Sequence, residues 1–140
     1  CDRDLCTAQS APRQIRLLYT LTPQGLQFDV QWFGKDAGRL SEALFLHLFP
    51  AAGRLRMRKL GEWVAPDDVV SMGGRNLHAV QETALETQAG RFRFVNRHAP
   101  LLSVGRGKIL EYDNRFEDPA KDGITYVLHD NVWGTNFPLW

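Results

Sequence analysis

The chain has 140 residues, the size of one domain, and 44% of them are hydrophobic, which is enough for a core without metal or disulfide support. The formal net charge is +1, so the totals give no indication of a nucleic-acid partner. No apolar stretch approaches the roughly 20 residues that span a bilayer, so we expect no membrane span.

The first 13 residues are polar and lack periodicity, which is typical of an arm or linker. Cys1 and Cys6 are the only cysteines in the sequence, and they can close a small loop or remain free thiols. We favour a disulfide, which would agree with an exported, extracellular protein. Because the sequence begins at Cys1, we expect a processed or excised piece whose targeting signal lies upstream.

Residues 14–33 have the pattern of a β-hairpin. QIRLLYTL and LQFDVQWF flank TPQG, in which Pro23 suits the second turn position and Gly25 the positive φ that closes the turn. In the second arm, apolar residues alternate strictly with polar ones, which predicts one buried and one exposed face. The alternating apolar residues are Leu26, Phe28, Val30 and Trp32.

Two further strands are predicted between residues 41 and 61. Residues 41–50 have apolar side chains at both odd and even positions, which predicts a central strand covered on both faces. Within it, we expect His47 to be a hydrogen-bonded core residue. Residues 54–61 alternate, with Leu55 and Met57 opposite three arginines. We interpret these arginines as a solvated strand face and keep an anion site as the alternative. They are Arg54, Arg56 and Arg58.

Between residues 61 and 88 the pattern weakens, and VQETALETQ fits a short helix or an irregular strand. Strand patterning returns in GRFRFVN, APLLSVG, GKILEYDN and GITYVLHDNVW. In the last of these, alternation places His129 on the same face as Thr125 and Val127. Seven or eight short strands predict an all-β fold, an antiparallel β-sandwich with at most one short helix. We assign residues 1–13 to the arm and residues 14–140 to a single sandwich domain.

The chemistry-bearing side chains do not form a recognisable catalytic set. The four histidines lack the spacing of a metal site, so we predict no metal, no cofactor and no catalytic residue. An acidic stretch from Glu111 to Asp122 fits a solvated loop with local ion pairs; a carboxylate pair for glycoside hydrolysis is the alternative. GRGK lacks the glycine that a phosphate-binding loop requires, and Ser103 lacks the context of a nucleophile elbow.

The closing segment DNVWGTNFPLW raises two alternatives. Tryptophan rings stack on sugar faces and asparagine amides offer paired donors and acceptors, so the segment could line a carbohydrate site. Alternatively, its aromatic side chains close the end of the sandwich while the asparagines satisfy turn backbone.

Three stretches together resemble a known family. LSEALFLHLFP, RKLGEWVAPDDVVSMGGRNLHAV and above all GITYVLHDNVWGTNFPLW are similar, in this order, to the C-terminal region of uncharacterised bacterial and fungal proteins related to family 38 glycoside hydrolases, the α-mannosidase-like enzymes. The resemblance covers residues 40–140. It implies that the sandwich is part of a larger, galactose-mutarotase-like super-sandwich domain, and that the catalytic acid and metal site belong to a separate barrel-like domain.

The resemblance therefore implies an accessory role. The chain would support or complete a carbohydrate cleft without carrying the nucleophile, and its partner would be a carbohydrate or a catalytic domain or chain. The alternatives are an autonomous carbohydrate-binding module, a small enzyme that uses His129 with Asp130 or Glu111, and a homo-oligomer. The candidate contacts to carbohydrate or to a neighbouring domain are His129, Asp130, Asn131, Trp133, Thr135, Asn136 and Trp140.

Overall fold

The computed structural model shows an antiparallel β protein, which confirms the predicted all-β class. Contacts divide the chain into two compact units, Cys1–Leu40 and Ser41–Trp140. The division falls after the hairpin, whereas the sequence analysis placed the hairpin and the rest of the chain in one domain. The structure describes residues 3–38, 41–49, 53–70, 75–108 and 117–131.

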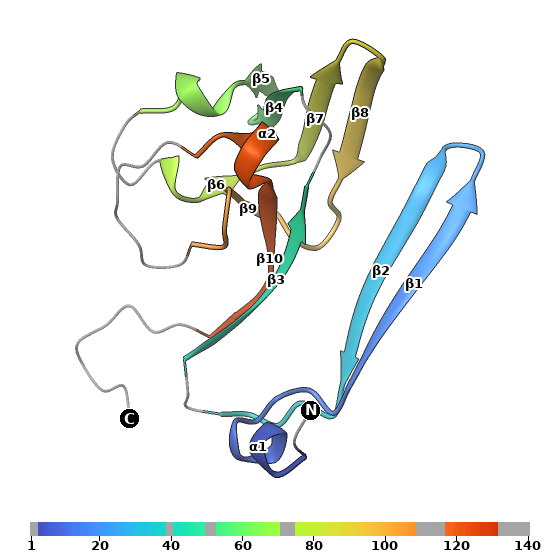
Figure 1. Ribbon diagram of the computed structural model, residues 1–140, viewed down its shortest axis with the longest axis vertical. Coiled ribbons are helices and arrows are strands. Elements are labelled where there is room, and N and C mark those ends of the chain that lie inside the picture. The colour runs from blue at the N-terminus through green and yellow to red at the C-terminus, as the bar shows by residue number, and fades with distance from the viewer. Residues whose placement is uncertain (1–2, 39–40, 50–52, 71–74, 109–116, 132–140) are drawn as a thin grey trace. The chain divides into compact units, whose positions relative to one another are not determined.

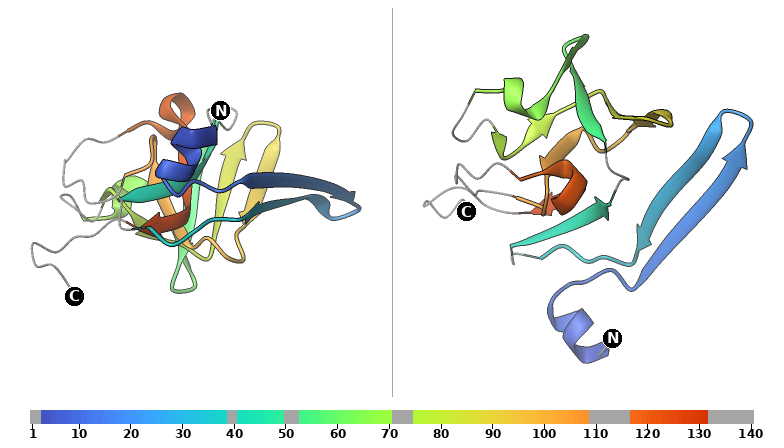
Figure 2. Two further views of the ribbon diagram at one scale, coloured as in Figure 1. Left: turned by 90° about the horizontal axis from the view of Figure 1, so that it is seen from below. Right: turned by 45° about the horizontal axis from the view of Figure 1, so that its top comes forward.

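The first unit contains helix α1 (Arg3–Ala8) and the hairpin of β1 (Gln14–Thr22) and β2 (Gly25–Phe33), drawn in blue in Figure 1. Both views in Figure 2 show the hairpin as an extended two-stranded ribbon. The predicted turn is confirmed, since Thr22 pairs with Gly25 and Gly25 has a φ of 135°. Within the expected arm, α1 is helical and Cys6 is disulfide-bonded, as favoured above.

The hairpin is amphipathic, but the first unit does not bury its apolar face. Residues directly opposite each other in an antiparallel pair point to the same face, so the register gathers the apolar residues of both strands on one side. Leu21 is 83% exposed and Leu26 is 64% exposed, so the first unit does not by itself bury this face. The cross-strand pairs of this face are Ile15–Trp32, Leu17–Val30, Tyr19–Phe28 and Leu21–Leu26.

The second unit contains two four-stranded antiparallel sheets. One has the order β3-β10-β9-β6, formed by Glu42–Leu48, Ile124–Asn131, Leu101–Val104 and His78–Ala79. The other has the order β5-β4-β7-β8, formed by Glu62–Val64, Arg54–Lys59, Glu82–Thr87 and Gly90–Val95. A 3₁₀ turn η1 (Pro66–Asp68) and helix α2 (Pro119–Asp122) complete its described elements.

The observed elements refine several predictions. VQETALETQ contains a strand, β7, rather than a helix, while β5 and β6 lie where the sequence pattern was weak. Across the described residues there are ten strands, and two short helices, α1 and α2, where the prediction allowed at most one. Most of GKILEYDN lies outside the described residues.

The two sheets of the second unit pack face to face around one hydrophobic core, as the sandwich prediction requires. Leu55 and Met57 of β4 contact a cluster that includes Leu102 of β9 and Ile124 of β10. A buried hydrogen bond of 2.5 Å also joins the hydroxyl groups of Thr83 on β7 and Tyr126 on β10. Burial raises the pKa of Tyr126 to about 12, so this hydroxyl stays protonated at neutral pH.

The prediction that residues 41–50 form a central strand is wrong. Within the described residues, β3 is an edge strand whose sheet neighbour is β10. Both its faces are apolar for another reason. Leu46 and Leu48 pack against the core, while the other face lies against glycines of two loops: a Cβ at Gly107 would come within 2.7 Å of the Phe45 ring, and one at Gly123 within 2.5 Å of His47 Nε2.

Candidate functional site

The candidate site lies where β10 ends beside β3. Within the described residues, β10 pairs with β9 as far as Tyr126, whereas its pairing with β3 continues to Asn131, which is opposite Glu42. Figure 1 shows these two strands running side by side beyond the rest of their sheet. The end of β10 is therefore held by one neighbouring strand, and polar side chains can occupy both of its faces.

A β-bulge changes the face on which His129 lies. Val127 is opposite Phe45, but His129 is opposite Leu44, so Leu128 is an extra residue in β10. Bulges of this kind redirect the side chains that follow them. His129 thus shares the face of Leu44, which is the core face of β3, and not the face of Thr125 and Val127 that strict alternation predicts.

The bulge brings His129 close to a carboxylate. Its Nε2 atom lies 3.7 Å from Oε1 of Glu42, and the two side chains are 33% and 23% exposed. The acidic partners predicted for His129 were Asp130 and Glu111, not Glu42. Glu42 lies far from His129 in the sequence, and only the strand register shows that the two residues meet. Glu111 lies outside the described residues.

The seven predicted contact residues have different outcomes. Asn131 lies directly opposite Glu42, so it shares the face of Glu42 and His129. Asp130 is opposite Ala43 and is exposed on the other face, so the structure does not place it with the histidine. The remaining four lie outside the described residues: Trp133, Thr135, Asn136 and Trp140.

A second polar row crosses the same sheet on the opposite face and is structural. Ser103, Thr125 and His47 are cross-strand neighbours on β9, β10 and β3. The Thr125 hydroxyl donates to the carbonyl of Gly105 at 2.6 Å, so it accepts from His47 Nδ1 at 3.0 Å. His47 is therefore hydrogen-bonded, as predicted, with its ring proton on Nδ1.

The GRGK segment binds a carboxylate of this chain. Lys108 is 2% exposed, and its Nζ atom lies 3.3 Å from Oε1 of Glu117. Glu117 also accepts a hydrogen bond of 3.1 Å from the Arg106 backbone N–H and fills the space beside Gly105, where φ is 77°. Glu117 therefore forms an ion pair, but its partner Lys108 lies before the acidic stretch and is buried, so this is not the solvated local pairing that was predicted.

The described residues contain no group of three or more His, Cys, Asp or Glu side chains placed to hold a metal ion. None of the helices seen there is long and apolar enough to cross a membrane. The side chains gathered at the end of β10 are one imidazole, one carboxylate and one amide, which can donate and accept hydrogen bonds.

Comparisons with known proteins leave the family open: no family model, no curated protein and no solved structure matches this chain.

Proposed function

We propose that this chain is an accessory β-domain of an α-mannosidase-like glycoside hydrolase, and that the end of β10 contacts carbohydrate or the catalytic domain beside it. The proposal rests on the resemblance of residues 40–140 to that family. The observation that supports it is the convergence of Glu42, His129 and Asn131 on one face, immediately before the tryptophan-containing segment.

These three side chains suit the recognition of sugar hydroxyl groups. A carboxylate accepts hydrogen bonds, and an amide both donates and accepts them. A neutral imidazole donates from one ring nitrogen and accepts at the other. Adjacent hydroxyls on a sugar ring need such mixed partners, and the ring of Trp133 would supply an apolar surface for the C–H face. The proposed role is binding, so the nucleophile and the metal site would belong to another domain.

Substitution of Asn131 by Ala tests this proposal. We expect it to weaken the binding of mannosides about tenfold, because a sugar hydroxyl loses a hydrogen-bond partner worth roughly 1–1.5 kcal/mol. Isothermal titration calorimetry measures the affinity, and thermal unfolding shows whether the variant is folded.

The matched control is His98→Ala, since His98 is exposed and lies outside this site. Its affinity should equal that of the unmodified chain. If Asn131→Ala and His98→Ala bind mannosides equally well, the end of β10 does not contact sugar.

The pair formed by His129 and Glu42 supports a second candidate function, a small enzyme in its own right. A carboxylate beside an imidazole can hold its ring in a fixed orientation, as a general acid–base pair requires. In this case hydrolysis of a test glycoside would show a bell-shaped pH profile that is lost in His129→Ala and Glu42→Gln alike. Activity that survives both substitutions would exclude this candidate.

A further inference from the structure

The outer face of the β5-β4-β7-β8 sheet, opposite Leu55 and Met57, gathers arginines from two strands. In the register of this sheet Arg54, Arg56 and Arg58 of β4 share a face with Arg91 and Arg93 of β8, across the intervening strand β7. We call these five residues the arginine face. The sequence analysis treated the three arginines of β4 alone, because the register that adds the two of β8 is not visible in the sequence.

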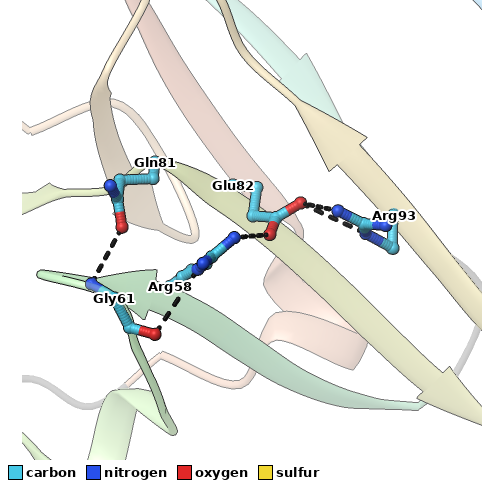
Figure 3. Close-up of polar contacts among 5 residues, drawn as sticks. All are labelled: Arg58, Gly61, Gln81, Glu82 and Arg93. Carbon is cyan, nitrogen blue, oxygen red and sulfur yellow. Dashed lines mark hydrogen bonds and ion pairs between the residues drawn. The ribbon is translucent and has the colours of Figure 1, made fainter.

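A buried carboxylate fixes two of these arginines. The Glu82 side chain is 6% exposed, and its Oε1 atom accepts a hydrogen bond of 2.9 Å from Arg58 Nη1. Its Oε2 atom accepts from both Nε and Nη2 of Arg93. Arg58 Nε also lies 3.4 Å from the Gly61 carbonyl, and the Gly61 N–H donates to Gln81 at 3.0 Å (Figure 3).

This network leaves donors for a ligand. Both carboxylate oxygens of Glu82 are occupied, whereas Arg58 Nη2 and Arg93 Nη1 have no acceptor among the described residues. The side chains of Arg58 and Arg93 remain 43% and 57% exposed. Two guanidinium groups are therefore held in place before a ligand arrives, which lowers the entropy that binding must offset.

The rest of the face is also cationic. Besides Glu82, its acidic residue is Glu86, which lies 3.9 Å from Arg91, so five arginines meet two glutamates and the face carries a net charge of +3. All the cations are arginines, whose planar fork matches a carboxylate in two parallel hydrogen bonds.

The aromatic residue on this face is covered. Trp63 lies opposite Arg58, and the guanidinium of Arg91 sits 4.2 Å from the centre of its ring. Proteins that bind single-stranded nucleic acid use open aromatic rings on which bases stack. Because the Trp63 ring is stacked against Arg91, the face offers charge and hydrogen-bond donors but not a stacking surface.

We propose that the arginine face binds an extended acidic peptide segment of a partner protein, with carboxylates at alternate residues. Alternate side chains of an extended chain repeat about every 6.6 Å on one face. The arginines of β4 have the same repeat, so a segment lying along this strand meets a guanidinium with each carboxylate. This site is separate from the end of β10, and the proposal does not depend on carbohydrate binding.

The test uses an alternating Glu-Thr octapeptide and measures its binding by fluorescence anisotropy. The comparison peptide has the same composition with its glutamates contiguous. We expect tighter binding of the alternating peptide, and binding that weakens as salt is added, because the contacts are between exposed charges. Equal affinity for the two peptides, or tighter binding of heparin or oligo(dT) than of the alternating peptide, would overturn the proposal.

Substitutions that spare the buried network test the site itself. Arg54→Gln and Arg91→Gln remove exposed guanidinium groups and leave Glu82 paired, and each should weaken peptide binding about threefold. The double variant should show about a tenfold loss. Arg97→Gln is the control, since Arg97 is exposed and lies beyond β8. A double variant that binds as tightly as this control would contradict the assignment.

Discussion

The burial of His78 makes the stability of the fold depend on pH. His78 is fully buried in β6, and this burial, together with the positive charge of Lys59, lowers its pKa to about 4, while the carbonyl of Arg75 opposes the shift. The imidazole is therefore neutral in the folded protein at neutral pH, while in the unfolded chain it takes up a proton near the usual histidine pKa of 6.5.

The pKa of His78 predicts a loss of stability in mild acid. Below pH 6.5 the unfolded chain binds a proton that the folded protein does not, so the free energy of unfolding falls as the pH drops towards 4. The full loss is about 3 kcal/mol for this pKa difference. Urea denaturation across this range measures it. His78→Leu should flatten the dependence and the exposed control His98→Gln should not; if both variants keep the slope, another group causes it.

Glu82 gives a second prediction at this scale. Glu82→Gln leaves Arg58 and Arg93 without their shared charge, and we expect it to lower the free energy of unfolding by about 1–2 kcal/mol, since both arginines are partly solvated. Glu86→Gln is the matched control, because Glu86 lies four residues further along β7 on the same face and is exposed. A chemical denaturation series compares the two. Equal stability of the two variants would mean that the buried network contributes nothing.

The environment of a single residue could be predicted where it depends only on the pattern of the strand that contains it. Leu55, Met57 and the hydrogen-bonded His47 follow from local pattern. Glu42 and Glu82 could not be predicted as partners, because their contacts are made across strands whose order and register the pattern does not contain.

At the scale of elements, the hairpin of β1 and β2 has no third strand to stabilise it in its sheet. A two-stranded sheet is marginally stable in water, and here eight apolar residues share one of its faces. A second copy of the chain presents the same face, so two copies can cover each other by two-fold symmetry.

We therefore predict that the chain self-associates through this face. Leu17→Lys places a charge in its middle and should shift the population from dimer to monomer in analytical ultracentrifugation. Thr20→Lys is the control, because Thr20 pairs with Gln27 on the polar face of the same hairpin. A strictly monomeric chain at high concentration, or equal effects of the two substitutions, would contradict this.

The presence of strands was the most predictable feature at this scale, because alternating apolar and polar residues can be recognised within one short segment. The hairpin, β4, β8 and β10 follow from this alternation. The position of β3 in its sheet could not be predicted in this way. Apolar residues at both odd and even positions indicated a central strand, yet β3 is an edge strand with loop glycines covering one of its faces. The bulge at Leu128 could not be predicted either, because the sequence pattern does not show which residue of the strand is the extra one.

At the scale of the whole molecule, the sandwich of the second unit places its distinctive polar groups at two sites. One is the end of β10, where Glu42, His129 and Asn131 share a face, and the other is the arginine face of the opposite sheet. The all-β class could be predicted from strand count and turn formers. The pairing of β3 with β10, which creates the first site, could not, because it joins segments from the two ends of the second unit.

Tryptophan fluorescence tests whether the end of β10 and the segment after it contact carbohydrate, as proposed. The unmodified chain is titrated with mannosides, other hexosides and short oligosaccharides. We expect a saturable change with mannosides that is abolished in Trp133→Ala while the variant remains folded. No response across the panel from a folded chain, together with a loss of several kcal/mol of stability in Trp133→Ala, would mark this segment as a packed corner and contradict the claim.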